Sequence, residues 1–343
     1  MKTGHRTSTS PNHCGCCGTS FQSRLVNGIV RCKSCDRPFH AKCFLKETGI
    51  NDIVKEKCVV CLCGVIERPY PVGVLRNPLA AKFLRDGFSV VSLSSDSRCK
   101  QRILKDLEKF HANADRYFSG FMRSYETELE VSGKAPSLEG GYTNFRKRGE
   151  GRYELISDQI QEEVLSIISG CDVLMRTINA LLTSSDGNKH GGKLMSCGCF
   201  YSLPGSERQV LHTDGPSLSS VEDLFPYAVN VFIPLVPMDR NNGTEFFPGS
   251  HKTGWNLKKQ KQEPVVPTVP LGKALLFDYR VLHRGMGNLR GTSRPCYYAT
   301  FSRPWYEDKY NFSSKRYKTS LHILPYLLEK RTERGGLKRS RSL

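Results

Sequence analysis

The spacing of hydrophobic residues divides the chain into a helical part and a strand-rich part. In Asp158–Leu182 the apolar residues recur at steps of three and four, which puts them on one face of a helix, and Gly170 marks where that helix would break. From Leu194 onward, short apolar runs alternate with turns rich in Pro, Gly and Asn. These runs are Phe200–Leu203, Ala228–Val236, Ala274–Phe277 and Tyr297–Phe301. Such alternation is typical of an antiparallel β-sandwich or barrel.

Three further elements are predicted before the helical segment, between residues 77 and 111. Asn77-Pro78 offers a helix N-cap followed by proline at the first helical position, and Gly87 ends the helix that begins there. Phe88–Leu93 predicts a strand, and Asp96–His111 predicts a basic helix.

Length and composition narrow the class of protein. The chain has 343 residues, which favours two domains at roughly 150 residues per domain. No run approaches the roughly 18 apolar residues of a membrane span, and Met1–Pro11 lacks the apolar core of a secretion signal. We therefore expect neither a secreted protein nor an integral membrane protein.

The charge is strongly positive. Lys and Arg number 51 against 33 Asp and Glu, so the formal net charge is +18, which favours polyanionic partners without naming one. The C-terminal tail, residues 311–343, is itself basic, and its Lys338–Arg341 resembles a nuclear-import cluster. We therefore expect a nuclear protein, with the cytoplasm as the alternative, and chromatin, protein or nucleic acid as candidate partners.

Cysteines cluster near the N-terminus in pairs spaced as metal ligands. Paired Cys and His residues in a chain without a secretion signal indicate zinc rather than disulfides, and four pairs make two closed, structural Zn(II) sites. The predicted zinc ligands are Cys14, Cys17, Cys32, Cys35, His40, Cys43, Cys58 and Cys61.

The order of these ligands resembles a PHD finger, including the aromatic residue before the histidine. The resemblance implies two interleaved ions, one held by Cys14, Cys17, His40 and Cys43, the other by Cys32, Cys35, Cys58 and Cys61. A variant RING-type ubiquitin-ligase module has similar ligands and stays open as an alternative.

A second metal site is predicted in the strand-rich part. His212-Thr-Asp214 is the only His-x-Asp in the chain, and residues i and i+2 of an extended segment face the same way, so both side chains can share an ion. His283 is the best third ligand, because it follows the apolar run 274–277 across a turn. Two histidines and one carboxylate are the ligand set of non-haem Fe(II) oxygenases. Eleven residues further on, Arg294 is suited to bind a carboxylate through two parallel hydrogen bonds.

Three segments carry a resemblance to phytanoyl-CoA dioxygenase-like enzymes, which use Fe(II) and 2-oxoglutarate. They are Gln209–Gly215 (QVLHTDG), Asn242–Lys252 (NGTEFFPGSHK) and Leu275–Asn288 (LLFDYRVLHRGMGN), and the interval from His283 to Arg294 also fits. The family's opening phrase resembles Phe83–Val91, so the likeness spans about residues 75–306. It implies an α+β fold, a double-stranded β-helix of the jelly-roll or cupin type with flanking helices.

The resemblance also implies roles for single residues. His212, Asp214 and His283 would bind iron, and Arg294 would bind the distal carboxylate of 2-oxoglutarate. Asn230 and Tyr201 would line the keto-acid end of that co-substrate. Asp214 favours hydroxylation, since related halogenases carry a small residue there. By contrast, His251 and Asp278 are expected to be structural.

These observations predict an enzyme, a 2-oxoglutarate-dependent dioxygenase of the oxidoreductase class, with Fe(II), 2-oxoglutarate and two Zn(II) ions as cofactors and O₂ as the oxidant. The domains expected are a tail at 1–12, the PHD-like finger at 13–66, a linker at 67–74, the dioxygenase domain at 75–310 and the basic tail at 311–343. We expect hydroxylation or demethylation of a nuclear macromolecule, with the finger for docking. One alternative is an oxygenase of a small-molecule or lipid-like acyl substrate, and another is a non-catalytic adaptor.

Overall fold

The computed structural model describes residues 14, 29–33, 38–40, 63, 77–94, 96–183, 192–259, 262–308, 311 and 316–318. In the predicted zinc module, β1 (Ile29–Arg31) pairs antiparallel with β2 (Pro38–His40), and Cys14 and Cys32 are buried. The side chain of His40 and the residues Cys17, Cys35, Cys43, Cys58 and Cys61 lie outside the described residues. The zinc sites and the domain boundaries therefore stay predictions.

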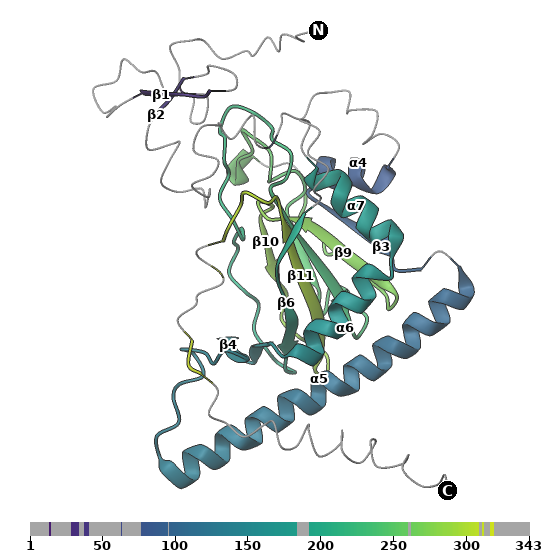
Figure 1. Cartoon of the computed structure of the whole chain (residues 1–343), viewed down its shortest axis with the longest axis vertical. Coiled ribbons are helices and arrows are strands. Elements are labelled where there is room, and N and C mark those ends of the chain that lie inside the picture. The colour runs from purple at the N-terminus through teal and green to yellow at the C-terminus, as the bar shows by residue number, and fades with distance from the viewer. Residues whose placement is uncertain are drawn as a thin grey trace, which may run out of the picture.

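A seven-stranded antiparallel sheet forms the centre of the molecule (Figure 1). Across the sheet the order of strands is β3 (Phe88–Ser92), β9 (Lys273–Asp278), β7 (Ala228–Pro234), β11 (Arg294–Ser302), β6 (Lys193–Ser202), β5 (Arg152–Leu155) and β4 (Phe145–Gly149). The four apolar runs singled out in the sequence all contribute to this sheet. The predicted strand after Gly87 is its first edge.

A small second sheet lies over one face of the large one. It consists of β8 (Thr244–Phe246) and β10 (His283–Gly285), and isolated bridges add His212 beside His283 and Val265 beside Phe246. Phe246 stacks on Phe88 of the large sheet at 4.7 Å between ring centroids. The two sheets therefore share an apolar core at one end.

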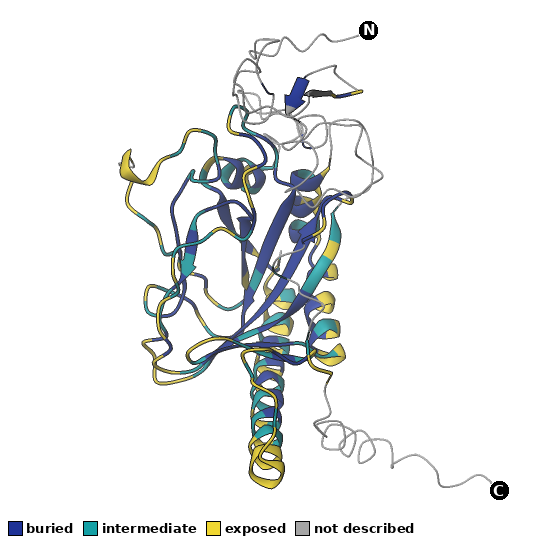
Figure 2. Ribbon diagram, turned by 90° about the vertical axis from the view of Figure 1, so that its left-hand side faces the viewer, coloured by how far each residue is buried: buried dark blue, intermediate teal, exposed yellow. Residues whose placement is uncertain are grey.

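Four helices cover the opposite face of the large sheet (Figures 1 and 2). They are α4 (Pro78–Asp86), α5 (Ser97–Ser132), α6 (Asp158–Ser169) and α7 (Asp172–Leu182), and a short 3₁₀ turn, η2 (Leu257–Lys259), lies in a loop. Each strand alternates its side chains between the helical face and the face of the small sheet. The predicted class, α+β, is confirmed as an antiparallel, sheet-rich fold with helices on one face.

Local signals explain where α4 begins and ends. The Asn77 side chain accepts a hydrogen bond from the Ala80 amide at 3.2 Å, and Pro78 takes the first helical position. Gly87 ends the helix at φ 88°, and a Cβ there would lie 2.7 Å from Val281 Cγ2. Only glycine combines this backbone conformation with such close packing. The predicted helix is confirmed.

The helix α5 is longer than its predicted span, Asp96–His111. Its buried residues continue at steps of three and four through Ala114 and Tyr117 to Phe121, and Gly133 caps it at φ 65°. The ring of Phe121 stacks on Phe145 of β4 at 3.9 Å, so packing against the β4–β5 hairpin supports the extra turns. The last turns, from about Glu126 to Ser132, are exposed (Figure 2).

The helical segment 158–182 breaks where the sequence predicts. The axes of α6 and α7 differ by 88°, with Gly170 and Cys171 between them. Within the described residues no single helix is long and apolar enough to cross a membrane, and only this bent, largely buried pair approaches that composition.

Candidate active site

A pocket lies between the two sheets. Its residues come mainly from the inward face of the large sheet, from β10 and from the segment before β7. They are Arg148, Arg152, Tyr153, Glu154, Phe200, Ser202, Gln209, His212, Asp214, Asn230, Phe232, Thr244, Tyr279, His283, Gly285, Arg294, Cys296, Tyr298, Thr300 and Asn311.

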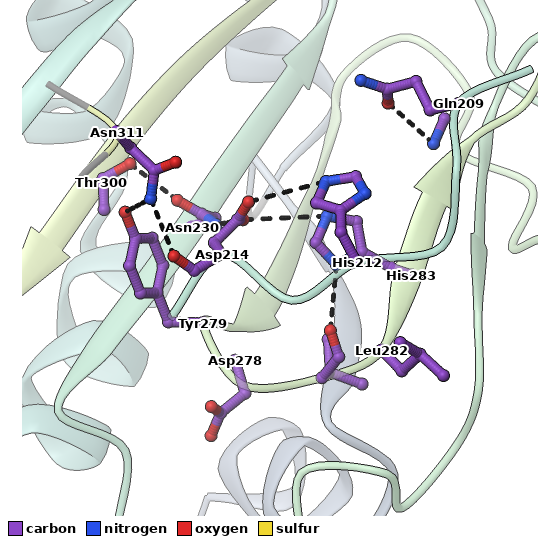
Figure 3. A network of polar contacts seen from close by, with 12 residues as sticks. Gln209, His212, Asp214, Asn230, Asp278, Tyr279, Leu282, His283, Thr300 and Asn311 are labelled. Carbon is purple, nitrogen blue, oxygen red and sulfur yellow. Dashed lines mark hydrogen bonds and ion pairs between the residues drawn. The ribbon is translucent and has the colours of Figure 1, made fainter. Parts of the chain in front are cut away.

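Three of the predicted ligands meet in this pocket (Figure 3). The His212 and His283 backbones pair, with N···O distances of 3.0 and 2.9 Å, so sheet pairing brings the two rings together. Asp214 Oδ1 lies 3.8 Å from His212 Nε2, and Asp214 Oδ2 lies 3.7 Å from His283 Nε2. One donor atom from each residue lies within 4.8 Å of the others, which is the reach of a single ion.

The tautomers of both histidines suit a metal. His212 Nδ1 lies 2.9 Å from the Val210 carbonyl, and His283 Nδ1 lies 2.9 Å from the Val281 carbonyl. Because a carbonyl oxygen only accepts, each Nδ1 carries the ring proton, and each Nε2 keeps its lone pair on the side of Asp214. Burial lowers the pKa of His283, which also favours the neutral ring. Two neutral imidazoles and a carboxylate therefore fit a divalent cation such as Fe(II).

Asp214 is held from two sides. Asn230 Nδ2 donates to Asp214 Oδ2 at 2.6 Å, and Thr300 Oγ1 donates to Asn230 Oδ1 at 2.7 Å, which turns the amide NH₂ toward the carboxylate. On the other side, Asn311 Nδ2 donates to the Asp214 carbonyl at 2.7 Å and lies 3.2 Å from the Tyr279 hydroxyl (Figure 3). The carboxylate orientation is thus fixed by neighbouring side chains before any ion binds.

Arg294 presents a buried cation that has no carboxylate partner among the described residues. The residue is 5% exposed, its Nη2 donates to Ser202 Oγ at 2.9 Å, and its Nε has no hydrogen-bond partner in the described part of the chain. Burial lowers the pKa of Arg294, since a desolvated guanidinium lacking a counter-ion is disfavoured. A pocket that keeps such a group is suited to a ligand carboxylate, which would supply the missing charge and acceptors.

Of the two residues expected to line the keto-acid end of the co-substrate, only Asn230 faces the pocket. Asn230 lines the pocket and contacts Asp214. Tyr201 does not line the pocket, because strand alternation sends Phe200 and Ser202 inward and turns Tyr201 toward the helices. Its ring stacks on Phe118 at 4.3 Å and its hydroxyl donates to Asp115 at 2.6 Å.

Several pocket residues carried no signal that sequence reasoning used. Thr300 and Ser202 could have been found from strand register, since they share the inward face with Asn230 and Arg294. Tyr279 and Asn311 belong to a turn and to the C-terminal segment, where no periodicity helps. The residues expected to be structural are so. His251 Nε2 lies 3.2 Å from the Leu84 carbonyl, and Asp278 accepts from the Arg280 amide at 2.9 Å.

Comparison with known protein families identifies the chain. Residues 83–296 match the family model of phytanoyl-CoA dioxygenase (PhyH), a span that covers more than half of the sequence and includes His212, Asp214, His283 and Arg294. The chain therefore belongs to the phytanoyl-CoA dioxygenase family, and it is a 2-oxoglutarate-dependent dioxygenase of the oxidoreductase class.

Solved structures with a similar fold share little sequence with the chain. The non-haem α-ketoglutarate-dependent epimerase SnoN of nogalamycin biosynthesis is 14% identical, with 68% of this chain and 87% of that one covered and a TM-score of 0.46. AviO1 from Streptomyces viridochromogenes Tue57 is 19% identical (68% and 97% covered, TM-score 0.46). HygX from Streptomyces hygroscopicus, solved with nickel, 2-oxoglutarate and hygromycin B, is 14% identical (66% and 87%, 0.45). The family assignment rests on the sequence match.

Proposed function

We propose that this pocket is the active site of an Fe(II)- and 2-oxoglutarate-dependent hydroxylase. His212, Asp214 and His283 hold the ferrous ion, and Arg294 binds the distal carboxylate of 2-oxoglutarate. The observation that carries the proposal is a single pocket that holds both a preset metal triad and a buried guanidinium with no carboxylate partner among the described residues.

When bound, iron and 2-oxoglutarate activate O₂ to oxidise a substrate C–H bond, while 2-oxoglutarate becomes succinate and CO₂. The chain's own residues bind and orient. Asn230 and Thr300 keep Asp214 turned toward the histidines, and Asp214 itself occupies a ligand position that a halide would need. Phe200 and Phe232 line the pocket and limit water beside the reacting groups.

The zinc module, the nuclear location and a macromolecular substrate remain proposals that rest on the sequence. Their support is the ligand spacing of residues 14–61, the net charge of +18 and the basic cluster at 338–341. A fluorescent fusion of the full chain tests the location. Exclusion from the nucleus, with no change on deleting residues 338–343, would remove that part of the proposal.

Succinate formation tests the central assignment. The full-length protein with Fe(II) and 2-oxoglutarate should release succinate, and His212→Ala and Asp214→Ala should abolish both this turnover and Fe(II) binding measured by anaerobic calorimetry. His111→Ala is the matched control, since His111 lies on α5 outside the pocket and should leave both unchanged. Wild-type protein that neither binds Fe(II) nor consumes 2-oxoglutarate would refute the proposal and favour the adaptor alternative.

A further inference from the structure

A second group of arginines gathers at the β4–β5 side of the pocket. Arg146 and Glu154 are directly opposed across the β4–β5 ladder. Arg148 Nη1 lies 3.5 Å from Glu154 Oε2, and Arg316, from the C-terminal segment, places Nη2 3.2 Å from the same oxygen. Three guanidinium groups thus surround one carboxylate.

Glu154 does not balance these charges. Its second oxygen, Oε1, already accepts a hydrogen bond of 2.6 Å from the Tyr298 hydroxyl. The buried Nε atoms of Arg146 and Arg316 have no hydrogen-bond partner among the described residues. With one carboxylate against three cations, the cluster keeps a formal excess of two positive charges. Desolvating a cation costs free energy unless an anion or hydrogen-bond acceptor compensates it, and the Arg316 side chain is only 9% exposed.

The cluster reaches the same pocket as the metal triad through Arg148 and Glu154. Arg148 and Glu154 both line the pocket, and Arg148 is 29% exposed along its side chain, so a ligand can reach it. The Arg148 guanidinium lies 5.7 Å from the Phe200 ring, which stacks on Tyr298 at 4.2 Å. An apolar floor therefore leads from the cations into the pocket.

The cluster is separate from the group assigned to the co-substrate. Glu154 pairs with Phe200, one inward position along the ladder from the Arg152–Ser202 pair, which is a step of about 7 Å. Between the two groups, Arg152 donates to the Glu207 and Met286 carbonyls, so its guanidinium is used within the protein. An anion at the β4–β5 arginines would therefore leave Arg294 available.

We infer that Arg146, Arg148 and Arg316 bind an oxyanion group, a carboxylate or a phosphate, of the substrate that is oxidised, so that the substrate of this enzyme is an anion. The inference rests on the proposed function, since it takes the pocket to be the active site. Guanidinium groups bind carboxylates and phosphates through paired, charge-assisted hydrogen bonds, and Arg148 presents such a group at the pocket wall.

Anion titrations under nitrogen test the inference. Full-length protein is saturated with Mn(II) and 2-oxoglutarate, so that the co-substrate position is filled without turnover. Inorganic phosphate or acetate is then titrated at constant ionic strength, and binding is followed by calorimetry. We expect millimolar binding of one of the two anions, and the tighter one identifies the oxyanion as phosphate or carboxylate.

Matched variants separate this site from general charge effects. The double variant Arg146→Gln/Arg148→Gln should weaken anion binding at least tenfold. The double variant Arg98→Gln/Arg102→Gln removes the same charge from exposed positions on α5 and should not change it. Glu154→Gln should instead tighten binding, because it removes the competing carboxylate while its amide oxygen can still accept from Tyr298. General destabilisation of the fold would weaken anion binding in both variants, so it cannot explain weaker binding in one and tighter binding in the other.

Two results would overturn the inference. One is anion affinity equal in the wild type and in Arg146→Gln/Arg148→Gln. The other is anion binding that disappears once 2-oxoglutarate is saturating, since the anion would then occupy the Arg294 position. Failure of the proposed function looks different. Mn(II) and 2-oxoglutarate would not bind at all, while phosphate or acetate still bound in an arginine-dependent manner.

Discussion

Replacing Arg294 by methionine separates binding of the co-substrate from stability of the fold. If Arg294 binds a 2-oxoglutarate carboxylate through two charge-assisted hydrogen bonds at about 1.5 kcal/mol each, the change removes about 3 kcal/mol. At 1.4 kcal/mol per factor of ten, the dissociation constant of 2-oxoglutarate should rise about a hundredfold. Metal affinity should persist, because Arg294 contacts none of the three ligands.

The same change should not destabilise the ligand-free protein. The Arg294 guanidinium is buried, its one oxygen acceptor is Ser202 Oγ, and its Nε has no partner among the described residues, so the free state carries an uncompensated charge. Methionine removes that penalty and fills most of the volume. Arg152→Met is the contrasting variant. It removes the hydrogen bonds to the Glu207 and Met286 carbonyls, and stability should fall.

Calorimetric titration of 2-oxoglutarate with Mn(II) under nitrogen measures the affinity, and urea denaturation of the metal-free protein measures the free energy of unfolding. An unchanged 2-oxoglutarate affinity in Arg294→Met would refute the assigned role. A loss of stability as large as in Arg152→Met would refute the argument that the free guanidinium is uncompensated.

Four further variants test the site and the stability of the fold. Thr300→Val should lower Fe(II) affinity at least tenfold in an anaerobic titration, because the Asn230 amide loses its orienting bond; unchanged affinity would contradict this. Gly87→Ala should lower the free energy of unfolding by about 3 kcal/mol and Gly205→Ala by about 1 kcal/mol. Both glycines have a positive φ, but only Gly87 is closely surrounded by other atoms. Equal losses of stability in urea denaturation would count against the packing argument. Burial lowers the pKa of His251 to about 4, so as the pH falls from 6.5 toward 4 only the unfolded state takes up a proton at this residue. The wild type should therefore lose up to about 3 kcal/mol of its free energy of unfolding over this range, and His251→Gln should retain it. Parallel pH profiles of the two unfolding free energies would disprove this.

Elements with short-range signals were predictable from the sequence. The cap residues Asn77 and Gly87 define α4 to the residue, and the glycine at 170 locates the bend between α6 and α7. The inner strands were predictable because each contains a short, largely apolar run bounded by turn residues. In contrast, α5 extends 21 residues past His111, and its support is tertiary. Phe121 packs on a hairpin, β4–β5, whose charged strands give no hydrophobic pattern of their own.

The residues of the site likewise differ in how far the sequence alone could predict them. His212, Asp214 and His283 were predictable because i, i+2 spacing and the ligand chemistry are local properties of the sequence. Tyr201 could not be assigned correctly without the register. Its neighbours Phe200 and Ser202 face the pocket, so the alternation of a strand decides that Tyr201 faces Asp115. Residue identity alone does not reveal which of two faces a strand residue takes.

The residues that line the pocket carry more positive than negative charge. Among the described residues that line it, the carboxylates are Asp214, at the triad, and Glu154, which already has three partners. Cations therefore exceed anions at Arg294 and at the β4–β5 arginines. A bound divalent ion raises that excess further. If the further inference holds, the pocket is most stable when it binds two anionic ligands, one at Arg294 and one at the β4–β5 arginines. The order in which the two ligands bind would then depend on which arginine group is the less compensated in the free protein.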